Sequence, residues 1–546
     1  MTGLRLFIID NTKVVSHVWS GRSCAGVRAI RHTRGVDPLP GECDVVVVGG
    51  GAAGLTAGGL LARAGRSVVV VEAESRPGGY LRSIECDGYS FDRAVQLVMG
   101  CNPDGPFGPG LIWQVLDALG VAGRVDAVRV DPFYVARLPG FALQVPTGRE
   151  AYIQAHARVV GAEERRIADL VDLCSRLFRE FADWPVRPGP LGWATAPFRF
   201  PRLVRDVRST SEAVMRRYLR DPRLRALYGA LSLSYVGTPP SSASFLTWAV
   251  MMASYVEEGA FYWRGGFQRL ADALAAGVCA QGGTLAVGRR VEEIVIEHGR
   301  ACGVRLDDGR VIRARAVVAA IDSRQTFDRL LDPALLPRRW RRRLDRTPLS
   351  PSFYTLYLGT NLDAAAVGAP FLSLLVPGWD LDEAGRCPQG GIGSDLTVTI
   401  PTLLDPSLAP QARHQVIIAG TAPPDEARVD HGAVAADYVR RAEAVLPGLR
   451  EHLAYAVGAN NGPSGPDRLP LHRFDAVYGW ANTPSASGPF RLSPTTPIRG
   501  LVLAGQWTQP GFGVWTVVAS GIQASRLVLG QGLRAGLGRV DQRQRP

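Results

Sequence analysis

The sequence predicts an α/β protein organised around a parallel β-sheet, and three observations near the N-terminus support this fold class. Residues 45–48 are a continuous run of valines, which is typical of a strand buried on both faces of a parallel sheet. A glycine-rich turn at residues 49–54 follows at once, and residues 55–64 are rich in alanine and leucine, which favours a helix ending at Gly65. Residues 67–71 predict a second buried strand.

The glycine-rich turn has the spacing Gly-x-Gly-x-x-Gly. Gly49 allows a tight turn, Gly51 lets the backbone approach a pyrophosphate, and Gly54 lets the next helix pack close to the strand. That helix would point unpaired N–H groups and its positive dipole end at the phosphates. Glu72 stands 18 residues after Gly54, near the offset of roughly 20 residues at which an acid binds an adenosine ribose. The stretch predicts a Rossmann-type dinucleotide site that disfavours NADP, because a carboxylate repels a 2′-phosphate.

Strands and helices follow in the middle of the chain. Residues 125–148 alternate and turn in a way that predicts short strands, and residues 150–183 have helical periodicity. Residues 211–220, 223–235 and 244–255 predict three further helices, of which the last is strongly apolar. Methionine and aromatic side chains in such a stripe are typical of a core.

The stretch from Trp184 to Pro201 mixes aromatic rings with arginine and proline, and it predicts a loop. Two interpretations are open. The rings could rest at a lipid–water interface at headgroup depth, or the segment could be an ordinary packed loop.

Two hairpins are predicted within residues 284–321, because His298-Gly299 and Asp308-Gly309 separate alternating runs. Residues 316–321 then return to the first sheet, and residues 497–504 add a last strand. We therefore expect the nucleotide-binding sheet to be assembled from three separate pieces of the chain.

Composition sets further limits. A chain of 546 residues is too long for one core, so two or three domains are expected. The eight cysteines show no zinc spacing and no Cys-x-x-Cys pair, which predicts free thiols in a reducing compartment and no metal site. We find no apolar window long enough to span a membrane and no secretory signal in the first 20 residues. The expected location is therefore cytoplasmic.

The net positive charge of the chain favours an anionic binding partner. The net charge is +12, and arginine supplies nearly all of it. This excess fits an anionic membrane surface better than nucleic acid, because no nucleic-acid motif is present. Peripheral contact with the inner face of the cell membrane and plain solubility both stay open. The basic run at residues 338–343 is either a solvated helix face or part of such a contact.

Motifs at both ends of the chain resemble those of one family. Arg76-Pro77-Gly78-Gly79 follows Glu72, and residues 500–514 carry a second glycine-rich motif before an apolar helix. Together with residues 259–266, they resemble the phytoene-desaturase-like flavoproteins, including carotenoid isomerases and retinol saturases, of the flavin amine oxidase superfamily. Tyr80 stands where amine oxidases usually have arginine, and Trp263 and Ala94 replace a proline and a glycine of the family.

The resemblance implies FAD as cofactor. No cysteine follows Cys387, so the C-terminal cysteinyl link of some amine oxidases is excluded and non-covalent FAD is expected. The implied cofactor-binding residues are Gly49, Gly51, Ala52, Ala53, Gly54, Glu72, Ala73, Arg76, Gly78, Gly79, Val291, Gly505, Gln506, Gly513 and Val514. The side chains predicted to face the flavin, besides Gln506, are Tyr262, Trp263, Arg264, Phe512 and Trp515. No catalytic acid or base is identified.

The domain prediction follows from the same motifs. It combines a Rossmann-type FAD-binding domain with an α+β substrate domain that has a helical lid. The divisions are a flexible basic arm at 1–42, FAD-binding segments at 43–124, 259–330 and 497–534, substrate-domain segments at 125–258 and 331–496, and a tail at 535–546.

The first functional hypothesis is an FAD-dependent oxidoreductase that desaturates, saturates or isomerises carbon–carbon bonds of a long apolar polyene. Its electron partner is not identified. The alternatives are a flavin amine oxidase or a natural-product tailoring oxidase, against which Tyr80 counts. A non-catalytic flavin- or lipid-binding partner of a membrane complex is the alternative of another class.

Overall fold

The computed structural model describes residues 39–161, 163–185, 189–385, 393–422, 431–460 and 476–531. The predicted arm lies outside the described residues except for positions 39–42, and the predicted tail lies wholly outside them.

The first sheet has seven strands in the order β10-β11-β12-β1-β2-β9, with β18 paired to β12. Its strands are β1 (Glu42–Val48), β2 (Val68–Glu72), β9 (Thr284–Val287), β10 (Val291–Glu297), β11 (Arg300–Leu306), β12 (Val311–Ala319) and β18 (Leu501–Leu503). The pairs β12–β1, β1–β2, β2–β9 and β12–β18 are parallel. The sheet draws on three distant stretches, as predicted, and the antiparallel order β10-β11-β12 confirms both hairpins.

Both faces of β1 are buried. Val45 and Val47 belong to one hydrophobic core, whereas Val46 and Val48 belong to another on the opposite face. Side chains alternate along a strand, so a run of valines provides an apolar surface to both cores. This arrangement confirms the interpretation of the valine run as a central parallel strand.

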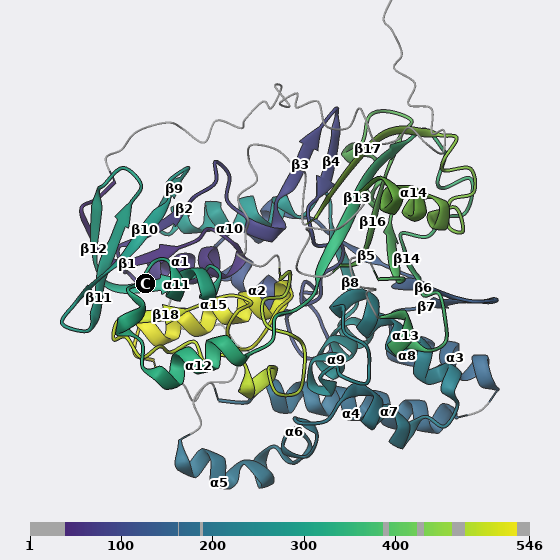
Figure 1. Cartoon of the computed structure of the whole chain (residues 1–546), viewed down its shortest axis with the longest axis horizontal. Coiled ribbons are helices and arrows are strands. Elements are labelled where there is room, and N and C mark those ends of the chain that lie inside the picture. Colours follow the sequence, from purple (N-terminus) through teal and green to yellow (C-terminus); the bar gives the residue numbers. More distant parts are fainter. Residues whose placement is uncertain are drawn as a thin grey trace, which may run out of the picture.

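Three helices cover one face of this sheet. Helix α1 (Ala52–Arg63) packs against α10 (Gln268–Ala280) and α15 (Val514–Val528). The backbones of α1 and α15 approach closely, because a Cβ at Gly521 would lie 2.5 Å from the carbonyl oxygen of Ala53. Figure 1 shows α15 in yellow beside α1, so the two glycine-rich motifs at opposite ends of the chain meet here.

The second sheet also has seven strands, in the order β17-β13-β16-β15-β14-β6-β7. These are β6 (Tyr134–Leu138), β7 (Phe141–Val145), β13 (Ser352–Thr360), β14 (Leu372–Leu375), β15 (Leu396–Thr399), β16 (His414–Ala422) and β17 (Leu453–Asn460). Only β14 and β6 pair in parallel. Helix α14 (His431–Ala442) packs on this sheet through Tyr438 and Val439. The sheet lies on the opposite side of the molecule from β10–β12 in Figure 1.

A helical layer lies below the second sheet in Figure 1. It consists of α3 (Arg149–Val160), α4 (Glu164–Ala182), α5 (Pro190–Arg199), α6 (Pro201–Asp206), α7 (Ser211–Tyr218), α8 (Pro222–Val236) and α9 (Phe245–Ala253). The prediction of a loop between Trp184 and Pro201 was wrong for residues 190–199, which form α5. Pro190 stands in the first turn of that helix, where a missing N–H costs no hydrogen bond.

Short elements join these layers. Two-stranded sheets pair β3 (Ser83–Cys86) with β4 (Tyr89–Asp92), and β5 (Ala127–Val130) with β8 (Ala260–Trp263). The remaining α-helices are α2 (Leu111–Ala118), α11 (Ser323–Asp328), α12 (Arg338–Arg346) and α13 (Leu381–Ala384).

Candidate functional site

A cavity of about 580 Å³ opens at the carboxyl ends of the parallel strands of the first sheet. Its wall includes Gly49 after β1, Ala320 after β12 and Gly505 after β18. It extends to the second sheet, where Thr355 of β13 and Ile417 of β16 line it. Ligands of open parallel sheets bind at this edge, so the topology leaves room for an elongated ligand between the two sheets.

The three glycines of the turn have different roles. A Cβ at Gly49 would lie 2.7 Å from Cγ2 of Ile321, and a Cβ at Gly54 would lie 2.0 Å from the carbonyl oxygen of Gly49. A Cβ at Gly51 would meet nothing within 4 Å. Gly49 and Gly54 are therefore required by the fold, whereas Gly51 leaves space beside the cavity for a ligand.

The N-terminus of α1 faces that space. Gly51 precedes the helix, no side chain accepts a hydrogen bond from its first turn, and no acidic residue lies there. Ala52 and Ala53 line the cavity at this end. Unpaired N–H groups and the helix dipole favour a negative group, and a pyrophosphate fits this position.

Glu72 also holds the glycine-rich turn. Its Oε2 accepts a hydrogen bond of 2.7 Å from the backbone N–H of Gly50, and its Oε1 accepts one of 2.9 Å from that of Glu74. Burial raises the pKa of Glu72, and the bond from Gly50 opposes this shift. The carboxylate lines the cavity, so it lies where an adenosine ribose would bind while it fixes the turn.

Most predicted cofactor residues line this one cavity. These are Gly49, Gly51, Ala52, Ala53, Glu72, Ala73, Gly78, Gly79, Val291, Gly505, Gln506, Gly513 and Val514. Gly54 and Arg76 do not line it. Gly54 packs against the turn, and Arg76 forms an ion pair of 2.9 Å with Asp272 of α10.

Of the six side chains predicted to face the flavin, Gln506 lines the cavity, but the other five do not, and this part of the prediction needs correction. The hydroxyl of Tyr262 donates a hydrogen bond of 2.5 Å to Asp92. Arg264 turns outward to an ion pair of 2.8 Å with Asp126. Trp263 is fully buried where β8 pairs with β5.

The other two lie close behind the wall. The ring of Phe512 stands 4.4 Å from that of Tyr478, which does line the cavity. Trp515 is turned toward Gly100, where a Cβ would lie 2.4 Å from Cδ1 of the indole. Both positions follow the C-terminal glycines, but their side chains fill the core around α15.

Asp92 reaches the cavity from β4. It accepts hydrogen bonds from Tyr262, from the backbone N–H of Phe267 at 2.8 Å and from the hydroxyl of Ser83 at 3.0 Å. Burial raises its pKa to about 6 against the effect of these donors. Asp92 therefore joins β3, β4 and the start of α10 on one side of the cavity.

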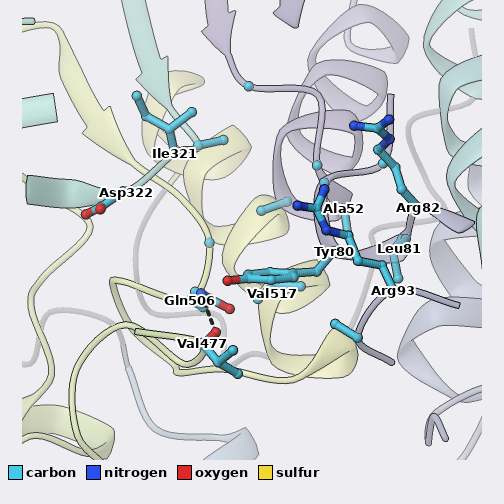
Figure 2. Close-up of a pocket in the computed structure, with 18 of the residues that line it drawn as sticks. Ala52, Tyr80, Leu81, Arg82, Arg93, Ile321, Asp322, Val477, Gln506 and Val517 are labelled. Carbon is cyan, nitrogen blue, oxygen red and sulfur yellow. Dashed lines mark hydrogen bonds between the residues drawn. The ribbon is translucent and has the colours of Figure 1, made fainter. Parts of the chain in front are cut away.

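Sequence reasoning missed several lining side chains. Figure 2 shows Tyr80 with its ring extending across the cavity toward Gln506, and Arg93 beside it. Tyr80 follows the glycine pair directly, so its position in the motif could have identified it. Tyr235 and Tyr478 also line the cavity, at its far end, but no motif surrounds them.

The C-terminal motif continues the wall beside the glycine-rich turn, because a Cβ at Gly505 would lie 3.8 Å from Cβ of Ala53. Gln506 donates a hydrogen bond of 2.8 Å from its side chain to the carbonyl oxygen of Val477, drawn dashed in Figure 2. The backbone N–H of Gly505 donates one of 3.0 Å to Ser520 of α15. Gly513 precedes α15 without a side-chain cap. A second uncapped helix N-terminus thus points at the same space.

Among the residues that the structure describes, no group of three or more histidine, cysteine or acidic side chains could hold a metal ion. The lining set suits an extended dinucleotide instead. It offers a carboxylate and Val291 at one end, a helix N-terminus in the middle and the C-terminal motif beyond it.

Known proteins match this chain over nearly its whole length. Residues 52–529 match the model of the family described as Flavin containing amine oxidoreductase. The chain is 28% identical to a chloroplastic prolycopene isomerase of Arabidopsis thaliana over 520 residues, which cover 89% of this chain and 82% of the relative. It is 30% identical to a phytoene dehydrogenase of Streptomyces griseus over 518 residues, covering 89% and 95%.

A solved structure supports the same fold. An oxidoreductase from Methanosarcina mazei superimposes with a TM-score of 0.61 at 17% identity, covering 88% of this chain and 99% of the other.

Proposed function

The chain belongs to the family of flavin containing amine oxidoreductases, and on this premise we propose that it is an FAD-dependent oxidoreductase acting on carbon–carbon bonds of a long apolar polyene related to carotenoids. The observation that supports this proposal best is the cavity itself. It joins a dinucleotide-type glycine turn to a largely apolar space against the second sheet. The names of the two relatives point to the same substrate class.

In this proposal the end of the cavity beside α1 binds the cofactor, and the end beside the second sheet binds the substrate. The N-terminus of α1 binds the pyrophosphate, with Gly51 leaving room for it. Glu72 orients the ribose, and Val291 packs on the adenine. When bound, the flavin supplies the acceptance or donation of electrons at carbon.

In this proposal the protein binds FAD without a covalent link. No cysteine is among the residues that line the cavity, within the part of the chain that the structure describes.

The substrate end excludes water and positions carbon chains. Phe353, Ile417 and Ala419 present apolar groups from β13 and β16, and Tyr235 and Tyr478 add aromatic rings. A conjugated chain stabilises charge that develops at an allylic carbon, so a strong general base is not required. Among the described lining residues, the carboxylates of Glu72 and Asp92 already accept hydrogen bonds within the protein.

A spectrum and a mass measurement test the proposal. The purified protein is expected to bind FAD that is released, unmodified, on denaturation. Under anaerobic conditions a polyene in lipid vesicles would bleach the flavin if the enzyme desaturates, whereas artificially reduced flavin would be reoxidised if it saturates. Release of hydrogen peroxide with simple amines would support an amine oxidase instead, and absence of flavin after reconstitution would refute the proposal.

We further propose peripheral contact with an anionic membrane, which is where a long apolar polyene dissolves. Among the described residues, no helix is long and apolar enough to cross a bilayer. Helix α5 instead exposes large apolar side chains: Leu191 is 76% exposed, Trp193 51% and Phe198 87%. In Figure 1 this helix lies at the edge of the molecule, away from both sheets.

Positive charge surrounds this apolar edge. Residues 189–205 contain no acidic residue, and Arg199 is exposed there, whereas the exposed Arg205 forms an ion pair of 2.6 Å with Asp206. Phe490 joins the basic helix α12 to the segment that follows α6: Arg208 lies over its ring at 4.7 Å, and Arg343 of α12 donates to its carbonyl oxygen at 2.9 Å. Apolar rings flanked by arginine match an anionic lipid surface. Each basic residue near such a surface contributes about 1 kcal/mol to the free energy of binding.

A further inference from the structure

A buried arginine stands directly behind the wall of the cavity. Arg491 is 1% exposed. Its guanidinium donates to the carbonyl oxygen of Gln506, at 2.9 Å from Nε and 2.6 Å from Nη2, and to that of Tyr478 at 2.7 Å from Nη2. Gln506 and Tyr478 both line the cavity. One side chain therefore connects two separate parts of the wall.

The charge of Arg491 has only neutral partners. A third carbonyl oxygen, that of Ala486, lies 3.3 Å from Nη1, and the ring of Phe512 lies 5.7 Å from the guanidinium carbon. Among the described residues, no carboxylate lies within 4 Å of its nitrogens. Burial lowers the pKa of Arg491 to about 9, so the group stays cationic at neutral pH.

An unpaired buried cation is costly to a fold, so its retention needs a physical reason. Carbonyl oxygens satisfy its donors, but they leave its net charge uncompensated. In a dry interior such a charge acts over a longer distance than in water. Gln506 and Tyr478, whose carbonyl oxygens it binds, line the cavity, and Gly513 and Val514 at the positive end of α15 line it too.

We infer that Arg491 is a positioning residue for the cofactor, which fixes the Gln506 and Tyr478 segments and favours the reduced, negatively charged form of the flavin. The inference rests on the proposed function, because it concerns the same cofactor. Arg491 does not touch the cavity and acts through the two backbone segments that it holds.

Three variants separate position from charge. Arg491→Met removes both the hydrogen bonds and the charge, whereas Arg491→Lys keeps the charge with fewer donors. Trp480→Phe is the matched neutral control, because Nε1 of Trp480 donates at 2.8 Å to the carbonyl oxygen of Trp507 and so joins the same two segments. FAD affinity is measured by titrating apoprotein and following flavin fluorescence, and the midpoint potential by dye equilibration of the holoprotein.

Distinct outcomes are expected. Loss of a charge-assisted hydrogen bond corresponds to a factor on the order of 10 to 100, so Arg491→Met weakens FAD binding by that factor. Its midpoint potential falls, by about 30 mV for each tenfold loss in preference for the two-electron reduced form. Arg491→Lys also binds FAD less tightly but keeps the wild-type potential. Trp480→Phe weakens binding and leaves the potential unchanged.

The inference is overturned if Arg491→Met binds FAD as tightly as wild type, or if its potential changes no more than that of Trp480→Phe. If Arg491→Met does not fold, Arg491→Lys decides, because a potential that falls in spite of the retained charge contradicts the inference. Wild-type protein that binds no flavin would refute the proposed function, whereas flavin in wild type with unchanged variants would refute the role of Arg491 alone.

Discussion

The Cα of Gly54 lies so close to the backbone of Gly49 that a Cβ at residue 54 would stand 2.0 Å from the Gly49 carbonyl oxygen. This contact lets α1 start directly against the end of β1. We predict that Gly54→Ala forces these elements apart and lowers the free energy of unfolding by at least about 3 kcal/mol, because neither partner is a flexible side chain. Urea denaturation of the apoprotein measures the loss.

Gly51→Ala is the matched comparison. A Cβ at Gly51 meets nothing within 4 Å, and the residue has a φ of −76° that alanine also adopts. We expect the stability of the apoprotein to stay at the wild-type value. FAD affinity should fall by on the order of tenfold or more, about 1.4 kcal/mol, because the methyl group enters the space left for the pyrophosphate. Equal FAD affinity in Gly51→Ala and wild type would contradict this placement of the phosphates.

Because Tyr262 does not line the cavity, we predict that its substitution lowers stability and leaves FAD affinity unchanged. Its hydroxyl donates to Asp92, and the side chain does not line the cavity. Tyr262→Phe should therefore destabilise the fold by about 1.5–3 kcal/mol, the usual contribution of a hydrogen bond to a charged group. FAD affinity per folded molecule should change little. A large loss of affinity at unchanged stability would show that the original assignment to the flavin pocket was right.

The sequence was sufficient for the parts of the site that backbone geometry determines. Gly49, Gly51 and Glu72 lie together because the strand–turn–helix–strand pattern leaves them no alternative. The valine run likewise predicted a central strand, because only a strand buried on both faces uses apolar side chains at every position.

Side-chain direction was not predictable in the same way. Trp263 and Trp515 stand near glycines of recognised motifs, but strand pairing and helix packing turn both rings into the core. Tyr235, Tyr478 and Arg491 come from segments with no motif, and only the tertiary fold brings them to the cavity wall. Helix α5 was mistaken for a loop because its prolines suggested irregular backbone. Pro190 stands in the first turn, where a helix tolerates it, whereas Pro197 lies inside the helix, where it removes one backbone hydrogen bond.

A buried carboxyl group predicts a specific dependence of stability on pH. Glu258 is 4% exposed, and its Oε2 has no hydrogen-bond partner among the described residues. Burial raises its pKa from 4.5 to about 7. Between these values the folded state binds more protons than the unfolded state, so this contribution to stability is present below about pH 4.5 and is lost as the pH rises to 7.

The shift corresponds to about 3 kcal/mol between pH 4.5 and pH 8. Glu258→Gln cannot ionise, so its stability relative to wild type should rise by about that amount over this range. Urea denaturation of both proteins at the two pH values gives the difference, in which the contribution of another buried acid, Asp92, cancels because both proteins contain it. A relative stability that is independent of pH would refute the assignment.

The exposed rings of α5 give the last prediction, which concerns the membrane. The double variant Trp193→Ser, Phe198→Ser removes two large apolar groups from the edge of the molecule. Burial of each is worth about 1.5–3 kcal/mol, so the partition onto vesicles of phosphatidylcholine with phosphatidylglycerol should fall by at least tenfold. Trp379→Ser is the control, because that ring is 37% exposed beside Phe141, apart from α5. The Trp379→Ser variant should float with vesicles as wild type does.

Removal of phosphatidylglycerol or addition of salt should weaken the binding of the wild-type protein to vesicles, because arginine supplies part of the attraction. If the double variant floats as well as the control, α5 is not the membrane contact.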